Sequence, residues 1–181
     1  MKIDHNKLIT VSRNCDATMI PGGEKIVLIE GTHVRITQSL GGNFTVLVSG
    51  NLVKLSGKDA DALGLGKEVK KNNRVPLRVA TEEDIWEAMK QCFDPEIPVN
   101  IVDLGLIYDL EISGKTNNQD IHIKMTLTAP GCGMGPSIAQ DVETKVSVLN
   151  GINNVDVELV WDPQWDQNMM SEEAKLQLGM L

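Results

Sequence analysis

An alternating strand runs into a glycine-rich turn in the stretch Met125-Thr126-Leu127-Thr128-Ala129-Pro130-Gly131-Cys132-Gly133-Met134-Gly135-Pro136. Apolar and polar residues alternate from Ile121 to Thr128, which is the period-two pattern of a half-buried strand. Downstream, Ser137 is a candidate N-cap for a helix that Gly151 would end. The pattern therefore predicts a strand, a turn and a helix, with Cys132 in the turn.

Cys132 is the candidate reactive residue of this turn. The dipole and the free N–H groups of a helix N-terminus favour a thiolate, which attacks electrophiles, accepts sulfur or binds soft metals. Gly131, Gly133 and Gly135 lack the side chains that would block a ligand's approach to the backbone. The alternative is a small buried hydrophobe at a tight turn, because free cysteines are among the most buried residues.

The composition argues against several classes of protein. With 181 residues, of which 41% are hydrophobic, the chain can bury one good core or two small ones. A net charge of -8 repels polyphosphate backbones, which disfavours nucleic acid as a partner. No apolar run suits a secretory signal or a membrane span. We expect a cytoplasmic protein that binds neither nucleic acid nor membrane.

The cysteines do not resemble a disulfide framework. Cys15, Cys92 and Cys132 are odd in number, widely spaced and without a C-x-x-C pair, which fits a reducing compartment. One chain cannot build a four-cysteine site. Any metal bound by cysteine would need other ligand types, a small thiol or a second subunit.

The N-terminal part has the pattern of a small antiparallel β unit. Short β-rich runs, separated by glycine-containing turns, cover residues 25–29, 32–37, 44–48 and 52–55. Residues 58–63 predict one helical turn closed by Gly64. The polar stretch 64–76 is typical of a linker. We therefore predict domains at residues 1–75 and 76–181.

The C-terminal part predicts an α+β domain. Thr81 and Asp84 form a candidate capping box for a helix that ends before Pro95 and keeps Cys92 in the core. Residues 105–112 predict a strand that forms a hairpin with the strand before Cys132, through a turn at residues 114–118. Residues 155–161 alternate as another strand, and Ser171 begins a last helix. The expected order is helix, β-hairpin, helix, strand, helix.

An acidic connection joins the first helix of this domain to its first strand. Three carboxylates and two prolines lie within residues 94–107. Prolines stiffen such a loop, and carboxylates can orient the partners of a thiol or ligate a hard metal. The alternative is that Asp94 caps a turn and Asp103 is solvated.

Three blocks together resemble the iron–sulfur cluster assembly factor family of the MIP-eighteen type: residues 94–98 with 102–107, residues 127–132, and residues 161–165. The resemblance covers residues 76–181. It implies an α+β domain that assists cluster assembly or delivery, and not an enzyme with a known small-molecule substrate.

The resemblance also assigns residues. It implies that Cys132 is the reactive thiol and an iron or iron–sulfur ligand, supported by Thr128 and by Asp94 and Glu96, which it places near the thiol. Weaker candidates for the same site are Asp103, Gly131 and Gly133. Many relatives have a second threonine where this chain has Ala129, and a proline where it has Gly133. The lost hydroxyl and the looser turn would lower the reactivity of the thiol.

The first hypothesis is a carrier. The Cys132 thiolate would hold or pass a labile iron–sulfur cluster, or an iron or persulfide precursor, between a scaffold or carrier protein and a client apoprotein. The remaining ligands would come from the partner or from a homodimer, so no tightly bound cofactor is expected.

Two other hypotheses remain open. In a metal-free adaptor, Cys132 would be structural and Trp161 and Trp165 would dock partners; the alternative for both indoles is a place in or over the core. A thiol enzyme would need a base. His122 is ten residues upstream on the strand, at about 3.3 Å per residue, so we expect it to be a solvated strand histidine.

Overall fold

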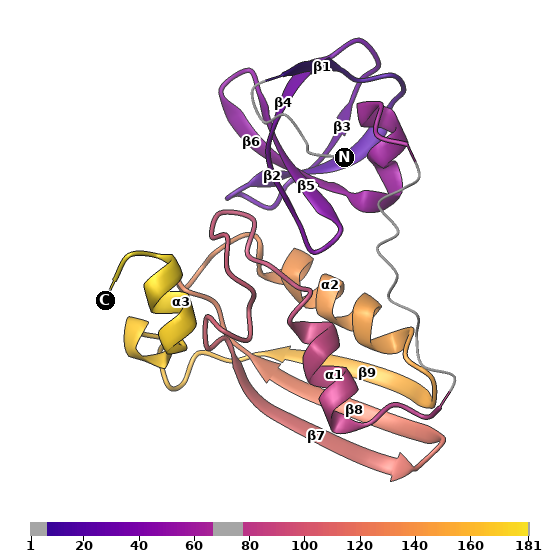
Figure 1. The fold of residues 1–181 in the computed structure, drawn as a ribbon, viewed down its shortest axis with the longest axis vertical. Helices are drawn as coiled ribbons and strands as arrows, with labels where there is room; N and C mark the ends of the chain where they lie inside the picture. The colour runs from indigo at the N-terminus through magenta and orange to yellow at the C-terminus, as the bar shows by residue number, and fades with distance from the viewer. Residues whose placement is uncertain (1–6, 67–77, 181) are drawn as a thin grey trace. The chain divides into compact units, whose positions relative to one another are not determined.

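The computed structural model describes residues 7–66 and 78–180. The chain divides into two compact units, Met1–Asn73 and Arg74–Leu181 (Figure 1). The predicted linker, residues 64–76, lies mostly outside the described residues, and the predicted domain boundary at residue 75 stays a prediction. None of the helices in the described ranges combines the length and the apolar character that crossing a bilayer requires.

The N-terminal unit is an antiparallel sheet with the strand order β1-β4-β5-β6-β2-β3. Alternation builds its core: in β4, Val34 and Ile36 are buried while His33 and Arg35 are exposed. A 3-10 helix closes the unit and ends at Gly64, which has φ +66° as predicted. The elements are β1 (Leu8–Thr10), β2 (Cys15–Ile20), β3 (Lys25–Leu28), β4 (His33–Leu40), β5 (Asn43–Val48), β6 (Asn51–Ser56) and η1 (Gly57–Leu63).

The neighbours of Cys15 in the sequence, Arg13, Asn14 and Asp16, are typical of an exposed segment, in which Cys15 would be a second thiol or an incidental one. The prediction of exposure is wrong. Cys15 lies in β2 with only 4% of its surface exposed. The charge that suggested exposure is paired, because Arg13 contacts Asp59 at 3.0 Å and Asp61 at 2.7 Å. Burial raises the pKa of the Cys15 thiol. Cys15 is therefore a core residue and not a second reactive thiol.

The C-terminal unit has the predicted order of elements. Its sheet runs β7-β8-β9, with β7 and β8 antiparallel and β8 and β9 parallel. A parallel pair requires a crossover, which α2 supplies, and α1 and α2 pack together on one face of the sheet (Figure 1). The elements are α1 (Glu82–Met89), β7 (Ile107–Lys115), β8 (Asn118–Met125), α2 (Gly135–Ser147), β9 (Ile152–Leu159), η3 (Gln167–Met169) and α3 (Glu172–Gln177).

The core of this unit follows the predicted periodicities. Ile121, Ile123 and Met125 of β8 are buried, as are the inward residues of both helices. The capping box is also confirmed, because the Thr81 backbone N–H donates to Asp84 Oδ2 at 2.8 Å. Cys92 is fully buried, as expected for a core cysteine.

The hairpin turn, the start of β7 and the start of α2 are among the predicted boundaries that shift. The hairpin is tighter than expected, because Lys115 pairs with Asn118 and leaves a two-residue turn. Strand β7 starts at Ile107 instead of residue 105, since Gly105 has φ +72° and does not continue a strand. Helix α2 starts at Gly135, with Pro136 in its first turn, so Ser137 lies inside the helix and is not its cap.

Candidate functional site

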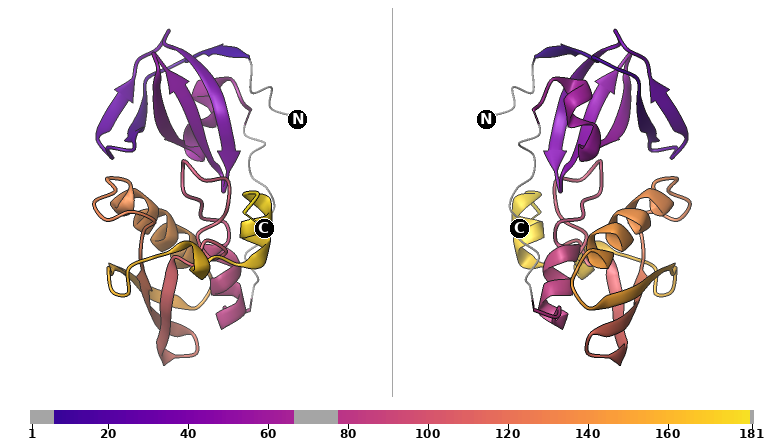
Figure 2. Two further views of the ribbon diagram at one scale, coloured as in Figure 1. Left: turned by 90° about the vertical axis from the view of Figure 1, so that its left-hand side faces the viewer. Right: turned by 90° about the vertical axis from the view of Figure 1, so that its right-hand side faces the viewer.

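The three blocks of the sequence resemblance meet at one row of the sheet. Ile107 at the start of β7 pairs with Met125 at the end of β8, and Met125 pairs with Leu159 at the end of β9. Residues 94–106 (the acidic loop), 126–134 (the cysteine loop) and 160–171 (the strap) all adjoin this row. Figures 1 and 2 place both loops and α3 at the end of the unit opposite the tip of the β7–β8 hairpin.

The cysteine loop is held at both ends by backbone hydrogen bonds. The Thr126 N–H donates to the Leu106 carbonyl at 2.8 Å, which ties the start of the loop to the end of the acidic loop. At the other end, the Gly135 N–H donates to the Cys132 carbonyl at 3.2 Å. Gly131 has φ +78°, a conformation that glycine adopts without strain. The loop thus has a defined path between β8 and α2.

Cys132 is partly exposed, whereas Cys15 and Cys92 are buried. It lies two residues before Met134, the N-cap of α2, so its loop leads directly to the free N–H groups of that helix. Part of the Cys132 surface is therefore accessible from solvent. The structure thus excludes the alternative in which Cys132 is a fully buried hydrophobe.

Gly135 has a different role from the one the sequence suggested. It is buried, and a Cβ there would lie 2.7 Å from Leu127 Cδ1 and 3.2 Å from Leu159 Cδ1. Glycine at this position lets the start of α2 approach the sheet closely. Gly135 therefore serves packing, not ligand access, while Gly131 is exposed and Gly133 is half-buried.

The residues before Cys132 differ in exposure. Thr128, the predicted supporting residue, is half-buried, and Ala129 is exposed. Thr126 was expected on the polar face, but only 1% of it is exposed, because β8 ends at Met125 and the alternation stops there. Its Oγ1 is buried and has no hydrogen-bond partner among the described residues.

The acidic loop is built on two local turns. Asp94 is buried, and its Oδ1 accepts a hydrogen bond from the Glu96 N–H at 2.8 Å. Glu96 is exposed. Asp103 is half-buried, and its Oδ2 accepts from Asn100 Nδ2 at 2.6 Å. Asp94 thus caps a turn, as one interpretation held, whereas Asp103 is not simply solvated. The proximity of Asp94 to Cys132 stays a prediction.

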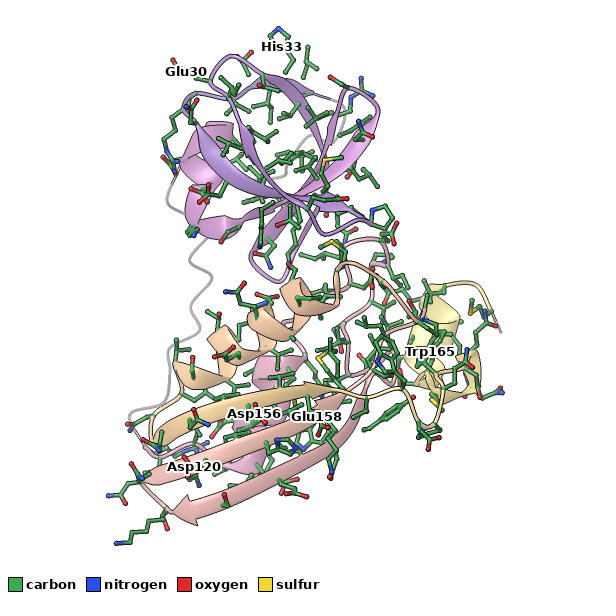
Figure 3. The ribbon with its side chains drawn as sticks, turned by 180° about the vertical axis from the view of Figure 1, so that it is seen from behind. Glu30, His33, Asp120, Asp156, Glu158 and Trp165 are labelled. Carbon is green, nitrogen blue, oxygen red and sulfur yellow. The ribbon has the colours of Figure 1, made fainter. Side chains whose placement is uncertain are left out.

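The strap packs on the acidic loop. Trp165 Nε1 donates to the Leu104 carbonyl at 2.8 Å, and the Ser171 N–H donates to the Asp103 carbonyl at 2.8 Å. Figure 3 shows Trp165 at this end of the sheet, next to α3. Sequence reasoning missed this contact, because the motif around Trp165 carries no signal for its partner 61 residues away.

Trp161 is exposed, with 45% of its surface accessible. The interpretation that it ends a strand inside the core is wrong, because β9 ends at Leu159 and the chain turns into the strap. The Val160 N–H still donates to the Met125 carbonyl at 2.8 Å. Trp161 therefore follows directly on the row from which the cysteine loop departs.

The open face of the sheet carries a separate polar cluster. His122 Nδ1 contacts Asp156 Oδ2 at 2.7 Å, and its Nε2 lies 3.3 Å from Glu158 Oε2. Figure 3 shows Asp156 and Glu158 on β9. His122 is thus one-third exposed and paired across the sheet. In residues 7–66 and 78–180, no group of three or more His, Cys, Asp or Glu is arranged to hold a metal ion.

Comparison with known proteins gives the family. The family model described as "Iron-sulfur cluster assembly protein" matches residues 82–159. A relative from Porphyromonas gingivalis, named Fe-S protein maturation auxiliary factor, is 45% identical over 101 residues, which cover 56% of this chain and 93% of the relative. The chain belongs to the family of Fe-S protein maturation auxiliary factors. The resemblance inferred from the three sequence blocks is thereby confirmed.

Other members of the Fe-S maturation factor family match about half of the chain. YitW of Bacillus subtilis is 40% identical over 106 residues, which cover 58% of this chain and 99% of YitW. SufT of Staphylococcus aureus is 39% identical over 87 residues, 48% of this chain and 96% of SufT. A solved domain of unknown function from Bacillus anthracis is 37% identical, covers 55% of this chain and 92% of that domain, and has a TM-score of 0.49. These relatives are named as auxiliary factors, not as enzymes.

Proposed function

We propose that this maturation factor carries an iron–sulfur cluster, or an iron or sulfur precursor, to client apoproteins through the Cys132 thiolate. The observation that carries the proposal is the exposure of the cysteines: Cys132 alone of the three is accessible. A thiolate is a soft ligand of the kind that holds the iron of iron–sulfur clusters in proteins. Membership of the family supplies the class of cargo.

The site would bind its cargo weakly. Cys132 offers one thiolate, and a cluster takes several, so the remaining ligands would come from a scaffold, a client or a second copy of the chain. Shared coordination suits transfer, because the cargo leaves when a client offers a more complete ligand set. The cargo at the thiolate would be oriented by Thr128 and by the carboxylates of Asp94 and Glu96. The conformation of the surrounding loops would depend on Asp103, Gly131 and Gly133.

The second candidate is a metal-free adaptor that links the assembly machinery to clients while Cys132 serves packing. The exposed Trp161 favours docking in either case. The partial exposure of Cys132 supports the carrier, because a thiol needed only for packing gains most when it is buried.

The content of iron and acid-labile sulfide distinguishes the carrier from the adaptor. Both are measured in anaerobically purified full-length protein and in Cys132→Ala. Activation of iron–sulfur enzymes is assayed in the native host with the same variants. If the protein is a carrier, its iron and sulfide content and the activation of client enzymes fall together in Cys132→Ala. Cys15→Ala, which removes a buried thiol elsewhere, serves as the control and should retain both. Client activation that persists in Cys132→Ala, with no iron in either protein, would favour the adaptor.

A further inference from the structure

The end of the sheet that carries Cys132 has carboxylates but no basic residue in its own sequence. The acidic loop contributes Asp94, Glu96 and Asp103, the strap contributes Asp162 and Asp166, and the cysteine loop contributes no charge. None of residues 94–106, 126–134 and 160–171 is Lys, Arg or His. Glu96, Asp162 and Asp166 are exposed. The segments that adjoin the row from which the cysteine loop departs therefore carry exposed negative charge.

The lysines that flank these segments in the sequence are each paired with a carboxylate, and Lys124, just before the cysteine loop, lies 3.5 Å from Asp109. Lys90 lies 3.0 Å from Glu87, and Lys175 lies 3.0 Å from Glu172. The carboxylate of Glu87 raises the pKa of Lys90, with a smaller contribution from Asp103. These lysines therefore pair with carboxylates outside the loop and strap, and among residues 7–66 and 78–180 no ion pair forms with Glu96, Asp162 or Asp166.

Trp161 lies in the strap, next to the exposed carboxylate of Asp162. Among the described residues, it is the one aromatic side chain in the set of large hydrophobics that are exposed. Trp161 directly follows Val160 in the sequence. The Val160 N–H donates to the Met125 carbonyl, at the row where the cysteine loop begins. Exposed tryptophans are favoured anchors of protein interfaces, where the indole fills an apolar pocket and surrounding contacts exclude water.

We propose that Trp161 is the anchor of a docking surface for a protein partner with a basic rim around an apolar pocket. The inference rests on the proposed function, since the partner that docks here would be the scaffold or client that exchanges cargo with Cys132. The negative charge of Glu96, Asp162 and Asp166 steers and orients a positive partner, and the indole supplies the buried contact.

Site-specific photo-crosslinking in the native host tests the surface. Gln164 is exposed within the strap, three residues after Trp161, so replacing it by p-benzoylphenylalanine puts the crosslinker in the same segment and leaves the indole intact. Glu143, exposed on α2, takes the same crosslinker as the control position. Crosslinked peptides are identified by mass spectrometry. We expect iron–sulfur proteins or assembly proteins at position 164 only, captured through segments rich in Lys and Arg.

Second substitutions in the Gln164 background decide what holds the partner. Trp161→Ala should lower the crosslink yield roughly tenfold or more, as for a central aromatic anchor. Asp162→Lys should also lower it, because the reversed charge repels a basic rim. Val148→Ala, which truncates another exposed hydrophobic residue, should leave the yield unchanged. Thermal melts of each variant establish that it is folded.

The proposal would be overturned if position 164 gave no crosslink, or if position 143 captured the same partners. It would also be overturned if the captured segments were acidic, or if the sole product were a second copy of this chain. An unchanged crosslink yield in Trp161→Ala would overturn it as well. Failure of the carrier mechanism looks different. Cys132→Ala should keep the crosslinks and lose client activation. If activation survives in Cys132→Ala while the crosslinks still depend on Trp161, the carrier mechanism falls and the docking surface stands.

Discussion

Replacing Gly105 by alanine perturbs the contact between the acidic loop and the strap. Gly105 has φ +72°, and a Cβ there would collide with the backbone carbonyl of Met169. The left-handed backbone alone costs an L-residue about 1–2 kcal/mol. The collision cannot be relieved by rotating a side chain, because the opposing atom belongs to the backbone. The strap itself must move.

The magnitude follows from what the strap would lose. Its two main hydrogen bonds to the acidic loop run from Trp165 Nε1 to the Leu104 carbonyl and from the Ser171 N–H to the Asp103 carbonyl, both at 2.8 Å. Each contributes about 0.5–1.5 kcal/mol net. Together with the backbone cost, Gly105→Ala should lower the free energy of unfolding of the C-terminal unit by about 2–5 kcal/mol.

Urea unfolding followed by tryptophan fluorescence measures this unit alone, because Trp86, Trp161 and Trp165 all lie in it. The control is Gly179→Ala, at φ +71° with no atom within 4 Å of the added Cβ, so it carries the backbone cost only. We expect Gly105→Ala to lose about 1–3 kcal/mol more than Gly179→Ala. Equal losses would refute the reasoning, because displacing the strap would then cost nothing.

Two further predictions concern thiol reactivity and pH. In native protein a disulfide reagent such as Ellman's should modify one thiol, Cys132, while Cys15 and Cys92 react only after denaturation; two fast thiols would contradict their burial. Hydrogen bonds from Arg78, followed by the Thr81 N–H, lower the pKa of Asp84 below its unfolded value of about 3.9. Its contribution is therefore present above that pH and is lost as the pH falls through the folded pKa. Asp84→Asn should destabilise the C-terminal unit by about 1 kcal/mol at neutral pH, and urea unfolding at pH 3 should show a smaller difference.

The features that could be predicted from the sequence depend on near neighbours in the chain. The capping box of Thr81 and Asp84 spans four residues, and the turn at Gly64 needs only a backbone that tolerates positive φ. The position of Cys132 between a strand and a helix follows from alternation on one side and helical spacing on the other. Such signals depend on residues that are close together in the chain, so they can be recognised in a single sequence.

The errors came from partners far away in the chain. Cys15 appeared exposed because its neighbour Arg13 is charged, yet that guanidinium pairs with Asp59 and Asp61, 46 and 48 residues later. Trp161 appeared buried because alternation in β9 reaches it, yet the strap leaves the sheet after Leu159. In the candidate site, local pattern identified Cys132, whereas Asp94, Glu96 and Thr128 came from the family resemblance alone.

Strand direction explains how three distant sequence blocks can serve one site. Strand β7 starts where β8 ends, because the two are antiparallel, and β9 ends at the same place, because it is parallel to β8. The row Ile107, Met125 and Leu159 is therefore the point where the acidic loop enters the sheet and the cysteine loop and the strap leave it. A purely antiparallel meander would have sent the strap from the opposite end. The crossover through α2 is thus what brings the exposed Trp161 to the end of the sheet from which the cysteine loop departs.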